Sequence, residues 1–169
     1  MTRRQLVFTA CAGLGLAPAA AALSRMSRPM INKPSQPSGP FAVSKTDEEW
    51  QASLTPKQYA VLRGHDTEYP GTSPLLHEHR TGVFVCAGCG QELFASDTKF
   101  ESGSGWPSFY DAREGAVGTT TDRTLGMSRV EIHCSRCGGH LGHVSPDGPL
   151  PTGQRYCTNG AALTFKPRE

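Results

Sequence analysis

The chain has 169 residues, which fits one domain of ordinary size and leaves little room for a second core. Its 19 glycines and 13 prolines are more than a helix bundle or a coiled coil usually contains, so turns and short strands are favoured. The formal net charge of +2 is too small to indicate a nucleic acid or an anionic membrane as partner.

Residues 1–22 have the layout of a cleaved signal peptide. Arg3 and Arg4 precede an uncharged stretch, rich in alanine and glycine, that runs from Leu6 to Leu23. The paired arginines resemble a twin-arginine signal, with Leu6 in place of the usual Phe. We therefore expect export in the folded state, to a bacterial periplasm, with a retained membrane anchor as the alternative.

A flexible linker is predicted over residues 23–43, which are rich in proline and polar residues and contain few apolar ones.

The folded domain is predicted over 44–169. Its capping boxes, Thr46-x-x-Glu49 and Thr55-x-x-Gln58, predict short helices near 47–53 and 56–63. Short alternating apolar runs then predict antiparallel strands. These runs cover 83–85, 116–121, 127–134, 141–144 and 155–165.

Two copies of the motif C-x-x-C-G each follow a strand-like run. The first contains Cys86 and Cys89, and the second contains Cys134 and Cys137. Two intervening residues let both sulfurs of a turn face one ion, so the pair predicts one structural Zn²⁺ per chain, with mononuclear iron as the main competitor. Disulfides are the other alternative in an exported protein, but they would close very small loops and stabilise the fold little. The long segment between the motifs means that the metal would join distant strands.

Cys157 is the one free thiol left in the mature chain when four cysteines bind metal and Cys11 is cleaved off. Strand periodicity places Arg155, Cys157 and Asn159 on one face. A positive charge beside the sulfur stabilises the thiolate, which is the nucleophilic form. A buried, unreactive cysteine and a solvated arginine are the structural alternatives.

Two histidines lie upstream, in the segment His140-Leu141-Gly142-His143. Gly142 permits a kink or bulge that would bring both imidazoles to one pocket. Imidazoles exchange protons near neutral pH, so they suit acid–base work beside a reactive thiol. Core histidines or metal ligands are the alternative interpretations.

Six motifs follow one another in the second half of the chain. They are Phe84–Cys89, Gly103–Phe109, Glu131–Cys134, His140–Val144, Pro146–Pro149 and Arg155–Asn159. From Gly82 to Phe165 the chain resembles the methionine-(R)-sulfoxide reductase family, the B type of methionine sulfoxide reductase. The resemblance implies a mainly β fold of two antiparallel sheets, short N-terminal helices, and a zinc staple remote from the catalytic sulfur.

The resemblance also implies an oxidoreductase that repairs oxidised proteins or peptides by reducing methionine-R-sulfoxide. Cys157 matches the nucleophile that becomes a sulfenic acid. His140 and His143 match the active-site histidines, with His143 as the proton donor.

Four further residues match the family. Arg155 and Asn159 match residues that set the thiolate and its hydrogen-bond network, and Asp147 matches a position that orients a histidine. Trp106 matches the indole wall against which the S-methyl group of the substrate packs, with a core aromatic as the structural alternative.

Three departures from the family are visible. Ser104 stands where many members have a recycling cysteine, and serine cannot form a disulfide with Cys157. We therefore expect a small thiol or a thioredoxin-like protein to reduce the sulfenic acid, unless an uncleaved Cys11 does so. Ser145 replaces a common Phe, and Gly160-Ala161-Ala162 replaces a more usual Ser-Ala-Ser.

Two rival functions are weaker. A non-catalytic zinc-ribbon binding module explains the C-x-x-C turns and leaves Cys157 and the histidines unexplained. A thiol–disulfide oxidoreductase usually has one C-x-x-C at a helix start, a context that is absent from the pattern. Cleavage would remove Arg3 and Arg4 and bring the net charge from +2 to about zero, which argues against nucleic acid. A monomer is expected.

Overall fold

The computed structural model describes residues 39–169. The predicted signal peptide, Cys11 and most of the predicted linker lie outside the described residues. Among residues 39–169, no helix has the length and apolar character needed to cross a membrane.

Two short helices open the described chain, α1 (Asp47–Ser53) and α2 (Pro56–Leu62). Both predicted capping boxes are present, since Thr46 and Glu49 bond each other's backbone N–H groups, as do Thr55 and Gln58. The helices bury Trp50, Val61 and Leu62. The predictions are confirmed, with α2 ending one residue early.

The end of the predicted linker is packed onto the domain. The N–H of Val43 donates to the carbonyl of Arg136 at 2.9 Å. The ring of Phe41 lies edge-on to His133, with centroids 6.0 Å apart, and covers Gly138, where an added Cβ would come within 2.4 Å of the ring. Phe41 and Val43, at the end of the predicted linker, therefore contact residues near the second C-x-x-C motif.

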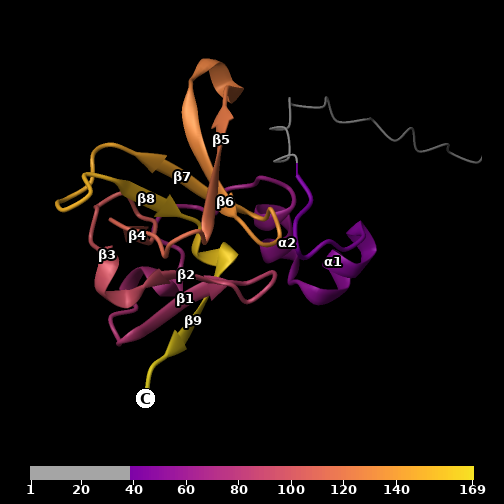
Figure 1. Ribbon diagram of the computed structural model, residues 1–169, viewed down its shortest axis with the longest axis horizontal. Helices are drawn as coiled ribbons and strands as arrows, with labels where there is room; N and C mark the ends of the chain where they lie inside the picture. Colours follow the sequence, from indigo (N-terminus) through magenta and orange to yellow (C-terminus); the bar gives the residue numbers. More distant parts are fainter. Residues whose placement is uncertain (1–38) are drawn as a thin grey trace, which may run out of the picture. The chain divides into compact units, whose positions relative to one another are not determined.

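The remaining chain forms two antiparallel sheets, as expected (Figure 1). The three-stranded sheet has the order β2-β1-β9, with β1 at Gly82–Cys86, β2 at Glu92–Ala95 and β9 at Leu163–Pro167. The six-stranded sheet has the order β3-β4-β8-β7-β6-β5. Its strands are β3 (Lys99–Phe100), β4 (Ser108–Phe109), β5 (Val117–Asp122), β6 (Arg129–Cys134), β7 (His140–Ser145) and β8 (Arg155–Thr158).

The predicted run 155–165 is divided between the sheets. It comprises β8, a short 3-10 turn at Gly160–Ala162, and the start of β9. Asn159 still bonds to the larger sheet, since its N–H donates to the carbonyl of Leu141 on β7 at 2.8 Å, and the chain leaves that sheet at the turn that follows. Strands β2, β3 and β4 were not predicted.

Aromatic side chains join the two sheets in the core. Phe94 of β2 stacks on Phe109 of β4 with centroids 4.3 Å apart, and Phe84 of β1 meets Phe109 edge-on at 4.9 Å. All three rings are fully buried. Burying each contributes roughly 1.5–3 kcal/mol, so this cluster holds the sheets in a fixed relation.

Candidate active site and metal centre

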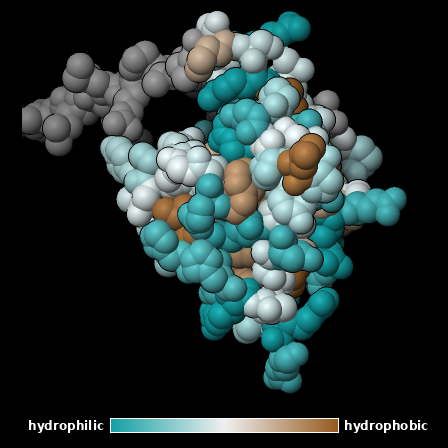
Figure 2. All heavy atoms as spheres, turned by 90° about the vertical axis from the view of Figure 1, so that its left-hand side faces the viewer, coloured by the Kyte–Doolittle hydropathy of each residue, from teal (hydrophilic) through white to brown (hydrophobic). Residues whose placement is uncertain are grey.

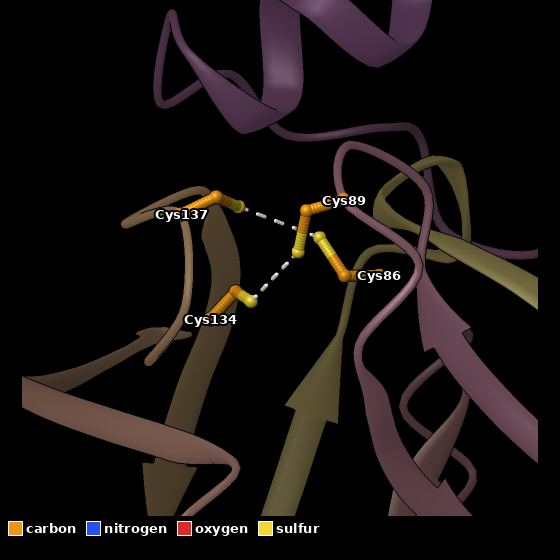
Figure 3. A group of neighbouring side chains, drawn as sticks. All are labelled: Cys86, Cys89, Cys134 and Cys137. Atoms are coloured by element: carbon orange, nitrogen blue, oxygen red, sulfur yellow. Dashed lines mark hydrogen bonds between the residues drawn. The ribbon is translucent and has the colours of Figure 1, made fainter. Parts of the chain in front are cut away.

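The four paired cysteines converge at the junction of the two sheets (Figure 3). Cys86 is the last residue of β1 and Cys89 lies on the turn that follows; Cys134 is the last residue of β6 and Cys137 lies on the turn that follows. An added Cβ on Gly88 would lie 3.5 Å from both Leu62 and Trp50, so the helices pack against the first turn. The predicted link between distant strands is therefore present as a cluster of four sulfurs.

The sulfur separations fit one tetrahedral ion. Sγ of Cys86 lies 3.7 Å from that of Cys137, and Sγ of Cys89 lies 3.5 Å from that of Cys134. A tetrahedral Zn²⁺ with Zn–S bonds of about 2.3 Å separates its sulfurs by about 3.8 Å. Disulfide sulfurs lie about 2.05 Å apart, and all four thiols are free. The cluster is thus consistent with zinc.

The second site begins as a row of side chains across neighbouring strands. Cys157 on β8 is directly opposite His143 on β7 and directly opposite Ser108 on β4. Residues paired in this way lie on the same face of a sheet, with Cβ atoms about 5 Å apart. Strand register, and not sequence proximity, therefore brings the imidazole of His143 beside the thiol of Cys157.

A pocket of about 230 Å³ opens over this row. Its lining includes most of the predicted site residues. The predicted residues in the lining are Trp106, His143, Arg155, Cys157 and Asn159. The other lining residues are Thr67, Arg129, Gly142, Ser145 and Thr158. The predicted common face of Arg155, Cys157 and Asn159 agrees with this lining, while Tyr156 packs against the core.

Arg155 is held beside Cys157 by Asp147. The guanidinium donates to both carboxylate oxygens of Asp147, at 3.0 and 2.7 Å. These bonds raise the pKa of Arg155, and the same pair lowers the pKa of Asp147. Asp147 therefore orients the arginine, and the expectation that it orients a histidine is wrong in this structure.

Asp122, at the end of β5, is the carboxylate that holds His143. Its Oδ2 lies 2.9 Å from His143 Nε2 and accepts from Arg129 at 2.6 Å. Burial lowers the pKa of His143, the hydrogen bond to Asp122 opposes that shift, and the charge of Arg129 adds to it. The pKa of His143 remains below its usual value.

His140 lies behind the pocket. A bulge in the pairing of β6 and β7, between Ile132 and His133, accompanies the predicted irregularity at Gly142. His140 is nevertheless buried and absent from the pocket lining, and its ring meets that of His143 edge-on with centroids 5.7 Å apart. The bulge was predicted correctly, but only His143 of the two histidines reaches the pocket.

The loop after α2 fixes the pocket wall. The carbonyl of Glu68 accepts from the Trp106 indole at 3.0 Å, and the N–H of Glu68 donates to Asn159 Oδ1 at 3.1 Å. The buried carboxylate of Glu68 accepts from the N–H of Gly160 and pairs with Lys57 at 3.2 Å. Glu68 thus holds both Trp106 and Asn159 in place.

Ser104, which stands where many family members have a recycling cysteine, lies next to Cys157. Its Oγ lies 3.7 Å from Sγ of Cys157 and 2.8 Å from Oγ of Ser102. No second cysteine among residues 39–169 lies beside Cys157, because the four others belong to the cluster of four sulfurs.

The surface on the side of β3 and the β7–β8 loop is mainly hydrophilic, with hydrophobic residues in separate patches (Figure 2). The large exposed hydrophobic side chains of the described residues are few. They are Tyr69, Met127, Val130 and Leu150.

Sequence reasoning missed the carboxylates that act on the histidines. Glu131 had a signal, since it is a lone carboxylate in the apolar run of β6 and belongs to a matched motif. Asp122 and Glu68 had none, because each contacts the site through segments distant in sequence.

Comparison with known proteins gives the family. Residues 54–167 match the model of the SelR domain. The chain is 54% identical to a protein of Leifsonia xyli over 78% of this chain and 96% of that protein, and 56% identical to one of Methanosarcina barkeri over 76% and 91%. A protein of Leptospira interrogans is 54% identical over 75% and 97%. All three are named peptide methionine sulfoxide reductase MsrB. The chain therefore belongs to the SelR family, that of the methionine-R-sulfoxide reductases.

Proposed function

We propose that this protein is a peptide methionine sulfoxide reductase that reduces methionine-R-sulfoxide through Cys157. The observation that supports it most directly is the pairing of Cys157 with His143 across β7 and β8, at the base of a pocket walled by Trp106. The relatives named peptide methionine sulfoxide reductase MsrB support the reaction type.

The first step transfers oxygen from the substrate to the enzyme. The thiolate of Cys157 attacks the sulfoxide sulfur, the S–O bond of the substrate breaks, and the oxygen ends on Cys157 as a sulfenic acid. The sulfoxide sulfur is reduced by two electrons and Cys157 is oxidised by two. One proton is taken up with the oxygen, and His143 supplies it as an imidazolium.

The surrounding groups have distinct roles in this step. The positive charge of Arg155, which is held in place by its hydrogen bonds to Asp147, stabilises the thiolate. Asp122 accepts from Nε2–H of His143, which leaves the Nδ1 proton for the sulfoxide oxygen. His140 supports His143 from behind the pocket, and Asn159 and Trp106 orient the substrate, with the indole packing on its S-methyl group.

An external reductant restores the thiol. One thiol displaces water from the sulfenic acid and forms a mixed disulfide, and a second thiol releases Cys157 and leaves as a disulfide. The absence of a second thiol beside Cys157 among the described residues supports a small thiol or a thioredoxin-like protein in this role. We expect oxidised proteins or peptides as substrate and a monomeric enzyme.

The metal and the cellular location complete the proposal. Cys86, Cys89, Cys134 and Cys137 would hold one Zn²⁺, which joins the two sheets and takes no part in the reaction. The paired arginines of the N-terminal segment support export to the periplasm after folding, so that the thiolates bind metal before they meet an oxidising compartment.

The test uses peptides that contain either sulfoxide epimer, with dithiothreitol as reductant. We expect turnover of the R epimer alone, abolished in Cys157→Ala and retained in Ser53→Ala, an exposed control on α1. An unchanged rate in Cys157→Ala would refute the proposal.

A further inference from the structure

We propose that Glu131 and His65 are positioning residues that hold His140 in one tautomer beside the proton donor His143. This inference rests on the proposed function, since it concerns the same reaction. It adds a layer of the site that lies behind the pocket.

The three side chains form a closed cluster in the interior. Oε1 of Glu131 lies 2.7 Å from Nδ1 of His140 and 3.2 Å from Nδ1 of His65. Their side chains are 2%, 4% and 1% exposed. The two imidazoles stack on each other with centroids 4.9 Å apart and an angle of 29°.

A carboxylate in such a place needs compensation, because burial penalises the charged form. Burial raises the pKa of Glu131, but the bonds to His140 and His65 outweigh it and lower that pKa to about 2. Glu131 is therefore ionised at neutral pH and can only accept hydrogen bonds. At 2.7 Å, Nδ1 of His140 must be the donor, which fixes the proton on that nitrogen.

His65 has no other evident task. It follows α2 in a left-handed conformation, with φ of 55°. Neither ring nitrogen has a hydrogen-bond partner of good geometry among the described residues, although both are buried. Burying an imidazole without hydrogen bonds destabilises the folded state unless a nearby polar group offsets the cost. The carboxylate of Glu131, 3.2 Å from Nδ1 of His65, is that group.

The cluster affects the chemistry through His140. Its ring lies edge-on to that of His143, with centroids 5.7 Å apart, so its orientation bears directly on the proton donor. The groups facing His140 are Glu131 and His133 of β6, His65 after α2, and His143 of β7. Holding its tautomer and position therefore sets part of the electrostatic environment of the proton donor.

Metal binding is the competing interpretation, because the three ligand atoms lie within 4.8 Å of one another. A tetrahedral Zn²⁺ with bonds of about 2.0 Å separates its ligand atoms by about 3.3 Å. The 2.7 Å between Glu131 and His140 is instead the length of a charge-assisted hydrogen bond.

Glu131→Gln tests the proposal, because it keeps the size of the side chain and removes its charge. We expect kcat to fall about tenfold to a hundredfold with KM nearly unchanged, since Glu131 does not line the pocket. The nitrogen chemical shifts of His140 should change from those of the Nδ1–H tautomer. Glu92→Gln, on the exposed end of β2, is the matched control.

His65→Asn is the second variant, and Asn is chosen because it tolerates the positive φ at this position. This variant tests the proposal if Glu131→Gln does not fold. It should lower kcat in the same direction. Unchanged kcat, a fall in kcat with unaltered His140 shifts, or a second metal per chain that Glu131→Gln removes would each overturn the proposal. R-specific turnover by the parent enzyme that depends on Cys157 would leave the proposed function standing.

Discussion

Oγ of Ser104 lies 3.7 Å from Sγ of Cys157, within reach of the reactive sulfur. The side chain at position 104 therefore decides whether the oxidised enzyme can close an internal disulfide. In the proposed mechanism, a hydroxyl at this position leaves the sulfenic acid to be reduced by external thiols.

Ser104→Cys should create that internal route. After one equivalent of R-sulfoxide peptide, the parent enzyme should gain one oxygen on Cys157 and react with a sulfenic acid reagent. Ser104→Cys should instead lose two thiols and form a disulfide, because the new sulfur replaces an atom already beside Cys157. Mass spectrometry distinguishes the products, with Ser104→Ala as control. A disulfide to Cys157 in the parent enzyme would contradict the predicted external reduction.

Asp122→Asn should shift the pH dependence of the first step. The bond to Asp122 raises the pKa of His143, so its loss lowers that pKa further and moves the alkaline fall in rate to lower pH. A shift of one unit reduces the protonated fraction above the pKa about tenfold. Single-turnover rates against pH measure this, and Asp97→Asn, an exposed carboxylate, is the control. An unshifted profile would show that His143, held by Asp122, is not the proton donor.

Loss of the metal should destabilise the junction of the two sheets. Cys134→Ser removes one of four ligands and should lower the melting temperature by about 10 °C or more, together with the metal content. Metal analysis of the parent protein should find one zinc per chain. Four oxidised thiols and no metal in the exported protein would favour the disulfide alternative.

Glu131 should contribute stability that disappears in acid. Its pKa is lowered to about 2 in the folded state, against an ordinary value of 4.5, so the contribution is complete above about pH 5 and is lost as the pH falls toward about 2. Urea unfolding at about pH 5 and about pH 3 should show a loss of about 2 kcal/mol that Glu131→Gln lacks. Equal losses of unfolding free energy in the parent protein and in Glu131→Gln would show that other groups cause the acid sensitivity.

Replacing Arg3 and Arg4 by lysine should stop export if the N-terminal segment is a twin-arginine signal. Cell fractionation would locate the protein, and sequencing the N-terminus of the exported form would show whether cleavage falls near Ala22. Undiminished export of the lysine variant would point to another route.

Features that depend on neighbours along the chain could be predicted from the residues alone. Capping boxes place both helices, because the cap and its partner are three residues apart. The two C-x-x-C motifs identify the four cysteines that cluster and could bind a metal, and strand alternation puts Arg155 and Cys157 on one face.

The carboxylates that contact the two histidines could not be predicted from the residues and are known from the fold. Asp122 holds His143, Glu131 holds His140, and Asp147 turns to Arg155 instead. These contacts depend on the register in which β5, β6, β7 and β8 pair, because a slip of one residue would turn every side chain of a strand to the opposite face. The same register, set by packing between the two sheets, leaves His143 in the pocket and His140 behind it.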